Sequence, residues 1–376
     1  MSAHHDDIEP TQGRTLPGRY FTSDNVFAIE REKLFHEKWF CVGRQEALAT
    51  PGDYFLADVA GESVIVTSNE HGQSLAFFNV CRHRGTRLVC EASGRFSRCQ
   101  IQCPYHRWTY DGSGRLIAAP HMDETMGFDR DDWPLLAIQV AAWEGFLFVN
   151  LSGSPESLKT AFGSFIETFR TWRVSDLRVV HREEYEAATN WKMLFENFNE
   201  CYHCISVHPG LNDLSPVNAC SNNFEKGPFL GGAMELASES MTTTGSRTAP
   251  PIRSLEPDDR RRVYYYTLLP NMMFALHPDF VVAWRIVPCG PGKTRIVVEW
   301  LFEPESIDLP DFDPGPAIQF WDKTNRQDWA ICEQSYLGVC SRAYLPGPWS
   351  SQESMPRAFD EEYLRVLGQE GPWVVK

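Results

Sequence analysis

The spacing of hydrophobic and polar residues divides the chain into segments with different expected structures. Residues 23–39 predict one amphipathic helix, because apolar residues such as Phe27 and Leu34 recur at helical spacing between charged ones. From residue 40 to residue 151, short apolar runs alternate with turns that contain Gly, Pro, Asn and Asp. This pattern is typical of a compact antiparallel β unit.

The rest of the chain mixes helical and strand-like patterns. Residues 156–173, 188–208 and 316–338 have helical periodicity. Residues 211–262 are rich in Ser, Thr, Asn, Gly and Pro, which predicts a functional lid or a partly mobile segment. Four strand-like runs then predict an antiparallel sheet: 264–269, 272–276, 280–288 and 295–302.

A loop-like composition at residues 152–155 predicts a domain boundary. We therefore expect an α+β protein in three parts. Residues 1–39 form an N-terminal arm and helix that pack on the last part, residues 40–153 form a β domain, and residues 154–376 form a larger domain with an antiparallel sheet.

Composition and charge narrow the class of protein. With 376 residues and 43% hydrophobic content, the chain is long enough for two packed domains, and its net charge of -15 argues against a nucleic-acid-binding surface. The start, M-S-A-H-H-D-D-I-E-P, is acidic where a secretory leader is basic, and no run reaches the ~20 apolar residues of a membrane span. The eleven cysteines are then typical of reduced thiols and metal ligands. We expect a cytoplasmic protein without a nucleic-acid or membrane partner.

The expected helix at residues 190–208 carries an unusual set of polar residues. Asn197, Glu200 and His203 share a stripe beside its apolar face, and His208 follows where the helix is expected to end. Two neutral imidazoles and a carboxylate suit a divalent transition metal. A core helix with hydrogen-bonded histidines is the alternative interpretation of this stretch alone.

The β domain contains a second candidate metal site. A C-x-H motif at Cys81 and His83 is followed, after nineteen residues, by a C-x-x-H motif at Cys103 and His106. Two loops that each offer one thiolate and one imidazole can bind zinc, or a [2Fe-2S] cluster with cysteines on one iron and histidines on the other. Structural zinc fingers usually pair C-x-x-C with H-x3-5-H, so the mixed loops favour the Rieske arrangement.

The residues around these motifs carry a family resemblance. C-R-H-R-G-T-R-L and C-P-Y-H-R-W-T-Y-D-G-S-G-R-L closely resemble the cluster loops of Rieske proteins of the ring-hydroxylating oxygenase type, and the resemblance covers nearly the whole chain. It implies an all-β Rieske [2Fe-2S] domain and a helix-grip type catalytic domain with a mononuclear Fe(II) site. Cys90 and Cys99, which lie between the two loops, are then expected to be ordinary thiols.

The same resemblance implies the ligands of the catalytic iron. Family members carry an acid-x-x-His-x4-His pattern, which Glu200, His203 and His208 match. They supply the third ligand from an Asp in a late helix, and Asp328 in R-Q-D-W-A-I-C-E-Q-S-Y-L-G is at the matching position. Two other acids on that helix are alternatives: Asp322 and Glu333.

Glu200 carries the most specific hint about substrate. Most homologues have Asp there, whereas E-C-Y-H-C-I-S-V-H-P-G resembles the branch that acts on quaternary ammonium compounds such as carnitine, glycine betaine, choline and stachydrine. The resemblance further implies that Glu200 is catalytic and bridges His106 of one chain to His203 of the next. A homotrimer is then needed for electron transfer.

The expected activity is that of a terminal oxygenase component. It would use O2 and electrons from NAD(P)H, delivered by a separate reductase, to hydroxylate a small-molecule substrate. An N-methyl group of a quaternary ammonium compound is the first candidate, with oxidative N-demethylation as the result; hydroxylation or N-dealkylation of an aromatic compound is the alternative. A pure electron carrier and a zinc-stabilised binding module are the competing classes of protein.

Several neighbouring residues have secondary interpretations. Asn197 and Glu196 could orient the ligands, as metal-bound histidines commonly require. Cys201 and Cys204 flank His203 and are expected to point to other sides of the helix. Aromatic residues in the predicted strands could hold a trimethylammonium group, although a sheet core would contain them as well: Tyr264, Tyr265, Tyr266, Phe274, Trp284 and Trp300.

Overall fold

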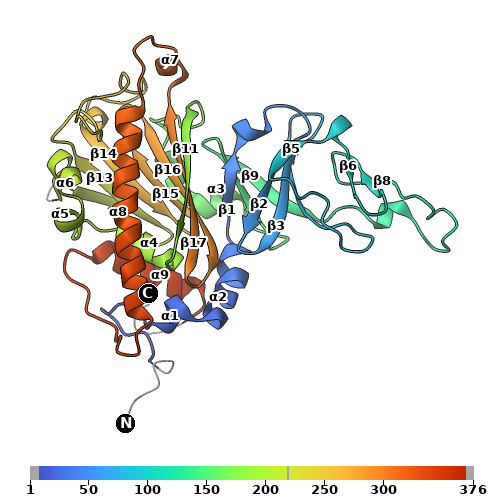
Figure 1. The fold of residues 1–376 in the computed structure, drawn as a ribbon, viewed down its shortest axis with the longest axis horizontal. Coiled ribbons are helices and arrows are strands. Elements are labelled where there is room, and N and C mark those ends of the chain that lie inside the picture. The colour runs from blue at the N-terminus through green and yellow to red at the C-terminus, as the bar shows by residue number, and fades with distance from the viewer. Residues whose placement is uncertain (1–7, 218–219, 370–376) are drawn as a thin grey trace. The chain divides into compact units, whose positions relative to one another are not determined.

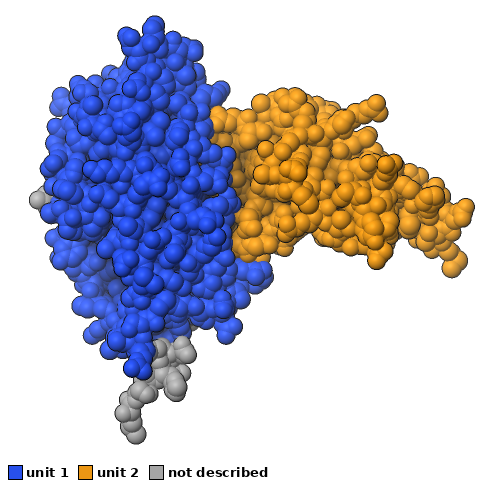
Figure 2. Space-filling view, in the orientation of Figure 1, with its two compact units in different colours: residues 1–34, 164–376 blue, residues 35–163 orange. Residues whose placement is uncertain are grey.

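The computed structural model describes residues 8–217 and 220–369, which divide into two compact units (Figures 1 and 2). One unit comprises residues 35–163, and the other comprises residues 1–34 and 164–376. The first seven residues of the expected N-terminal arm lie outside the described residues. Each unit contains its own seven-stranded sheet, and helices accompany the sheet of the larger unit, so the predicted α+β class is confirmed.

The unit of residues 35–163 is the predicted antiparallel β unit. Its main sheet has the order β1-β10-β9-β4-β3-β2-β5, and a smaller sheet has the order β6-β7-β8. A short helix, α3 (Leu158–Phe162), follows the last strand. The strands are β1 (Phe40–Arg44), β2 (Asp53–Val59), β3 (Glu62–Ser68), β4 (Ser74–Phe78), β5 (Ser93–Arg95), β6 (Ile101–Gln102), β7 (Thr109–Tyr110), β8 (Leu116–Ala118), β9 (Ala137–Trp143) and β10 (Phe146–Asn150).

The larger unit is built on a second antiparallel sheet, in the order β11-β17-β16-β15-β14-β13-β12. Its last four strands in the sequence confirm the four predicted strand-like runs. Two further strands lie in the segment predicted to be a lid or partly mobile, so these parts of the segment are paired into the sheet. The strands are β11 (Arg178–Ala187), β12 (Cys220–Phe224), β13 (Phe229–Glu235), β14 (Arg262–Leu268), β15 (Met272–Leu276), β16 (Val281–Gly290) and β17 (Lys293–Phe302).

Strands β12 and β13 escaped prediction because their sequence lacks apolar alternation. They are stabilised by pairing: β13 pairs along its whole length with β14, with Ala233 opposite Tyr264. At Gly232, a Cβ atom would lie 2.2 Å from the carbonyl oxygen of Ser221, so only glycine lets β12 approach here. Glycine in β13 therefore has two effects: it weakens the apolar pattern by which a strand is predicted, and it permits the close approach of β12.

Helices of this unit lie against the sheet, and Figure 1 shows α8 lying across its face. Helix α8 confirms the helix predicted at 316–338. Within the described residues, none of the helices has both the length and the apolar composition needed to cross a bilayer. The helices are α1 (Arg19–Thr22), α2 (Asp24–Glu30), α4 (Trp191–Phe198), α5 (Cys204–Val207), α6 (Pro209–Leu214), α7 (Pro304–Ile307), α8 (Gly315–Val339) and α9 (Ser354–Val366).

The helix predicted at 188–208 is interrupted. It begins at Asn190, whose side chain caps α4, and α4 ends at Phe198. Glu200 and His203 lie in the turn before α5, because the Glu200 carboxylate accepts hydrogen bonds from the backbone N–H groups of Tyr202 and His203. These bonds replace helical ones, so the prediction of a single continuous helix is wrong.

Two other predicted helices are shorter than expected. The segment at 23–39 forms α2, which Ser23 caps, followed by a π-helical turn at residues 31–35. In the segment at 156–173, α3 ends at Gly163, whose φ of 50° lies in the left-handed region. A short 3-10 turn and irregular turns follow. Apolar spacing predicted these helices but not their ends.

Buried charges attach the N-terminal segment to α4. The ammonium of Lys192 lies 2.5 Å from Oε1 of Glu30, and the indole N–H of Trp191 donates to Oε2 of Glu30 at 3.0 Å. Tyr363 of α9 donates its hydroxyl to the same carboxylate. Two elements, α2 and α9, thus hold α4 in place immediately before the candidate metal ligands.

Candidate metal centres

Two loops with the same backbone hydrogen bonds carry the C-x-H and C-x-x-H motifs. In each loop, the cysteine N–H donates to the carbonyl five residues further on, and the N–H four residues further on donates back to the cysteine carbonyl. The residues at that fourth position, Gly85 and Arg107, both have positive φ, 71° and 58°. Cys81 and Cys103 therefore occupy equivalent places in two equivalent turns.

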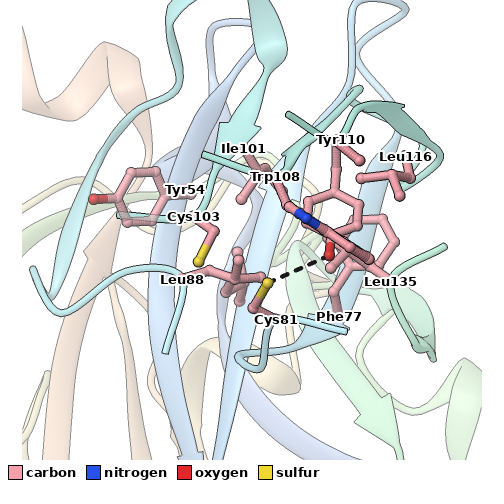
Figure 3. Packing of buried hydrophobic residues seen from close by; sticks show 12 residues of the cluster. Tyr54, Phe77, Cys81, Leu88, Ile101, Cys103, Trp108, Tyr110, Leu116 and Leu135 are labelled. Carbon is pink, nitrogen blue, oxygen red and sulfur yellow. Dashed lines mark hydrogen bonds between the residues drawn. The ribbon is translucent and has the colours of Figure 1, made fainter. Parts of the chain in front are cut away.

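The two motif cysteines lie in one buried core beside the smaller sheet, which Figure 3 shows. The thiol of Cys81 lies 3.5 Å from the hydroxyl of Tyr110, and Cys103 is close enough to hydrogen bond to Cys81. Burial raises the pKa of the Cys103 thiol. Cys90 and Cys99 are absent from this core; Cys90 is exposed and Cys99 is partly buried.

The two motif histidines face each other with ring centroids 4.6 Å apart. His83 also stacks on Trp108, with nearly parallel rings 4.8 Å apart. Burial, together with the neighbouring His106, lowers the pKa of His83, which favours the neutral imidazole. Nδ1 of His83 is buried and has no hydrogen-bond partner within the described chain. Two buried thiols and an unpartnered imidazole nitrogen fit a [2Fe-2S] cluster bound by two cysteines and two histidines.

The second centre joins the helix interruption to α8. One ligand atom each from His203, His208 and Asp328 lie within 4.8 Å of one another. Oδ1 of Asp328 is 2.7 Å from Nε2 of His208 and 3.4 Å from Nε2 of His203. His208 is 2% exposed, whereas the other two side chains are each 17% exposed. The group is thus nearly buried but open on one side.

The alternative acids on α8 are engaged elsewhere. Asp322 accepts the hydroxyl hydrogen bond of Tyr185 at 2.7 Å and binds the Arg326 guanidinium at 3.0 Å. Glu333 accepts from the backbone N–H of Ala188 at 2.8 Å. Of the three acids, Asp328 is therefore the one that contacts both histidines.

Each histidine of this centre is oriented by a hydrogen bond at its other nitrogen. Nδ1 of His203 is bound to Oε1 of Glu200, and Nδ1 of His208 lies 2.9 Å from Oε1 of Gln327. Both bonds leave Nε2 directed toward Asp328, the arrangement that metal-bound histidines require. Sequence reasoning missed Gln327, although it is the residue next to Asp328; it identified Asn197, whose Nδ2 is 3.4 Å from Nε2 of His203.

The charge at this centre favours a bound cation. Burial disfavours the imidazolium of His203, but hydrogen bonds to Asp328 and Glu200 outweigh it and raise its pKa to about 10. The pKa of Asp328 is lowered, because its two histidine hydrogen bonds outweigh the effect of burial. Two imidazoles and one carboxylate fit Fe(II), which such a set binds with open positions on one side. A metal ion would take the place of the proton on Nε2 of His203.

A cavity of about 450 Å³ opens beside this centre and is lined by His203, His208 and Asp328. Tyr265 is the one residue of the six predicted aromatic candidates that lines it. Phe198 and Trp321 line it as well, with ring centroids 5.9 Å and 6.2 Å from that of Tyr265. The other five candidates are not among its lining residues: Tyr264, Tyr266, Phe274, Trp284 and Trp300.

The remaining neighbours of His203 differ from expectation. Cys201 and Cys204 line the cavity together with His203, because the helix is interrupted there and they do not point to other sides of it. They are not part of the three-residue metal group. Glu196 lies beside Asp360 and Lys192, and burial raises its pKa to about 7. A residue that orients a metal ligand would contact that ligand, whereas the neighbours of Glu196 are the charged side chains of Asp360 and Lys192.

Comparison with known families matches both units. Residues 38–139 match the Rieske [2Fe-2S] domain, and residues 174–369 match the catalytic domain of the ring-hydroxylating α subunit. The glycine betaine monooxygenase oxygenase subunit of Chromohalobacter salexigens is 28% identical over 381 aligned positions, which cover 92% of this chain and 84% of that protein. The carnitine monooxygenase oxygenase subunit of Acinetobacter baumannii is 34% identical over 211 positions, 56% of either chain.

The fold agrees with these matches. A crystal structure of a quaternary ammonium Rieske monooxygenase in complex with an inhibitor superimposes with a TM-score of 0.80 and 25% sequence identity, over 95% of this chain and 96% of the other. With both domains matched, the chain belongs to the family of Rieske ring-hydroxylating oxygenase α subunits, beside its quaternary ammonium monooxygenases, and is an oxidoreductase that incorporates O2.

Proposed function

We propose that this α subunit is the terminal oxygenase that hydroxylates an N-methyl group of a quaternary ammonium compound. The resulting carbinolamine collapses, so the net reaction is N-demethylation with release of formaldehyde. The observation that carries the proposal is the convergence of His203, His208 and Asp328 at a cavity with aromatic walls. The relatives that act on glycine betaine and carnitine support the substrate class.

Electrons enter through the Rieske unit. Cys81, Cys103, His83 and His106 would hold the cluster, whose neutral imidazole ligands let it accept an electron at a higher potential than an all-cysteine cluster. The electrons come from NAD(P)H through a separate reductase protein. The unpartnered Nδ1 of His83 supports its role as a ligand.

His203, His208 and Asp328 would hold Fe(II), which supplies the place where O2 and substrate meet. Glu200 and Gln327 keep Nδ1 of the two imidazoles occupied, so that Nε2 of each remains available as a ligand atom. The faces of Phe198, Tyr265 and Trp321 attract a trimethylammonium group and exclude water around it.

Glu200 has a second proposed role, between subunits. By family resemblance it bridges His203 to His106 of a neighbouring subunit in a homotrimer. Its carboxylate is fixed for this task, because one oxygen binds Nδ1 of His203 and the other accepts from two backbone N–H groups. Replacing Glu200 with Gln is expected to preserve both metal sites and to stop turnover, and undiminished activity would contradict the bridging role.

The function is tested by formaldehyde release from purified enzyme and reductase with NAD(P)H. The panel contains betaines, carnitine, choline and N-alkyl aromatic compounds. The proposal expects formaldehyde from quaternary ammonium compounds and about three iron atoms per chain, two in the cluster and one in the catalytic site. Turnover of the aromatic compounds alone would replace this substrate class with the alternative, and about two iron atoms with no turnover would indicate an electron carrier.

A further inference from the structure

The two cysteines of the C-Y-H-C sequence have no role in the proposed function. Cys201 and Cys204 both line the cavity beside the candidate iron site. Cys201 is partly exposed, whereas Cys204 is 4% exposed. Neither belongs to the group of three candidate metal ligands. A small reagent in the cavity can therefore reach the thiol of Cys201 without displacing a ligand.

A tight turn brings the two thiols together. The backbone N–H of Cys204 donates to the carbonyl of Cys201 at 3.2 Å, and a turn closed in this way holds its end Cα atoms within about 7 Å. The two thiols are close enough to hydrogen bond to each other. Disulfides join cysteines whose Cα atoms are about 4.4–6.8 Å apart. The turn therefore allows a disulfide between these two residues.

The same turn contains a candidate iron ligand. His203 lies between the two cysteines, and Nδ1 of its ring is bound to Oε1 of Glu200. The other carboxylate oxygen of Glu200 accepts from the backbone N–H groups of Tyr202 and His203, the two middle residues of the turn. A movement of the backbone in this turn therefore acts on the hydrogen bonds that orient the ligand.

We propose that Cys201 and Cys204 form a reversible disulfide on reaction with hydrogen peroxide, and that this disulfide weakens iron binding at the proposed catalytic site. In the disulfide the sulfur atoms lie about 2.05 Å apart, which is closer than a hydrogen-bonded contact between thiols. This approach pulls the turn together and disturbs the hydrogen bonds between Glu200 and His203. The inference rests on the proposed iron site but not on the substrate class.

The chemistry of the step balances with peroxide as the oxidant. The thiol of Cys201, the more exposed of the two, attacks one oxygen of the peroxide; the O–O bond breaks, and a sulfenic acid and one water form. The thiol of Cys204 then displaces the hydroxyl of the sulfenic acid as a second water, and the S–S bond forms. The two thiols lose two electrons and two protons, and the peroxide is reduced to two waters.

An oxygenase is itself a source of this oxidant. Hydrogen peroxide is the product when O2 takes up two electrons and no substrate is hydroxylated. The cysteine pair lies in the wall of the cavity where O2 and substrate are proposed to meet, so it is exposed to peroxide formed there. Turnover without hydroxylation would thus remove iron from its own site until a thiol reductant restores the pair.

Peptide mapping tests the disulfide. The reduced, iron-loaded enzyme is treated without O2 with a small excess of hydrogen peroxide, or with diamide, which oxidises thiol pairs without iron. Free thiols are then alkylated and the protein is digested. The peptide with Cys201 and Cys204 is expected to escape alkylation and to be two hydrogen atoms lighter. Alkylation of both cysteines, or a disulfide from either of them to Cys220 of the same cavity wall, would overturn the proposal.

Competition with a chelator tests the effect on iron. In diamide-treated wild type, the affinity of the catalytic site for iron is expected to be about tenfold or more below that of the reduced enzyme, because the bonds that orient His203 are disturbed. The visible absorption of the cluster should be unchanged, and tris(2-carboxyethyl)phosphine should restore the affinity. Equal affinities of the two forms would overturn the proposed coupling.

Variants of the cysteines locate the cause. Cys201→Ser and Cys204→Ser each remove one thiol, and each is compared with its own untreated sample. Diamide should leave the iron affinity of both variants unchanged. Cys220→Ser is the matched control, because it removes a cysteine of the cavity wall and keeps the pair, so it should respond as the wild type does. A loss of affinity in Cys201→Ser equal to that in the wild type would overturn the proposal.

The outcomes separate this inference from the proposed function, because neither the mass of the peptide nor the iron affinity requires turnover. If the enzyme releases formaldehyde from quaternary ammonium compounds and forms no disulfide, the proposed function stands and the inference is overturned. If the disulfide forms and weakens iron binding while only aromatic compounds react, the inference stands and the proposed substrate class fails.

Discussion

The cluster loops and the candidate iron site differ in how far apart in the chain their ligands lie. The candidate cluster ligands come from two turns in one unit, and each turn closes on itself through backbone hydrogen bonds. The candidate iron ligands come from an interrupted helix and from α8, and His208 and Asp328 are 120 positions apart in the chain. The first site is determined by local backbone geometry, whereas the second depends on how two helices pack on a sheet.

The two sites also differ in what orients their histidines. His83 is held by stacking on Trp108, and its Nδ1 has no partner in the described chain. At the iron site, Glu200 and Gln327 hold Nδ1 of both imidazoles by hydrogen bonds. Metal binding at the cluster site should therefore be lost mainly when a ligand itself is substituted. Metal binding at the iron site should also weaken when a residue that orients a ligand, but does not touch the metal, is substituted.

The largest expected effect is from Asp328→Ala. The site loses the carboxylate that, among the described residues, contacts both histidines, so iron is expected to fall from about three atoms per chain to about two and turnover to background. Iron analysis and the visible absorption of the cluster check this together. Asp322→Asn on the same helix is the control and should retain iron; full turnover by the Ala variant would contradict the site.

Cys103→Ser is the reciprocal experiment on the other site. We expect it to remove the visible absorption of the cluster and all reductase-driven turnover, because Cys103 lies in the buried core with Cys81. Iron at the second site should remain. Cys99→Ser, a cysteine outside that core, serves as control, and a cluster that survives the change at Cys103 but not at Cys99 would reverse the assignment of ligands.

Gln327→Leu tests whether the histidines of the candidate iron site depend on hydrogen bonds for their orientation. It removes the hydrogen bond to Nδ1 of His208 and leaves the three ligands in place, so iron affinity at this site is expected to fall about 10–100-fold. Competition with a chelator measures this affinity, and the cluster should be unaffected. Lys323→Gln, a change at an exposed position on the same helix, is the control and should alter neither the iron affinity nor the cluster. Equal chelator resistance of Gln327→Leu and wild type would show that the hydrogen bond between Gln327 and His208 is dispensable.

The smallest expected effect concerns the buried acid behind the iron site. Burial raises the pKa of Glu196 from 4.5 to about 7 and outweighs the Asp360 hydrogen bond and the Lys192 charge, which lower it. The contribution of Glu196 to stability is therefore present below about pH 4.5 and is lost as pH rises toward 7. Relative to Glu196→Gln, the wild type is expected to lose up to about 2 kcal/mol between pH 5 and pH 7. Urea unfolding at both pH values measures the difference, and parallel pH dependence of the two proteins would contradict it.

Motif spacing alone singled out the four candidate cluster ligands, whose thiols share one buried core and whose imidazoles face each other. Cys81, His83, Cys103 and His106 lie in short turns whose geometry depends on neighbouring residues, so motif spacing contains most of the information. Sequence reasoning also predicted the helix that carries Asp328 and the strands β14–β17, because long apolar patterns survive in the sequence.

The parts that were missed depend on contacts between distant residues. The interruption of the helix at Glu200 arises because its carboxylate takes over backbone N–H groups, which apolar periodicity cannot reveal. Gln327 gains its role only when α8 brings it to His208. Strand β12 is mostly polar and β13 contains two adjacent glycines, so both depend on strand pairing, β12 with β13 and β13 with β14.

By itself, the sequence determined the two motif loops, the candidate ligands and the family to which they belong. Only the tertiary structure decided which acid on α8 meets both histidines, and which aromatic residues line the cavity rather than the sheet core. The physical reason is the separation in sequence of the residues that interact. Turns and periodic elements depend on residues a few positions apart. A ligand set and a cavity wall instead require the free energy of packing to bring distant helices and strands together.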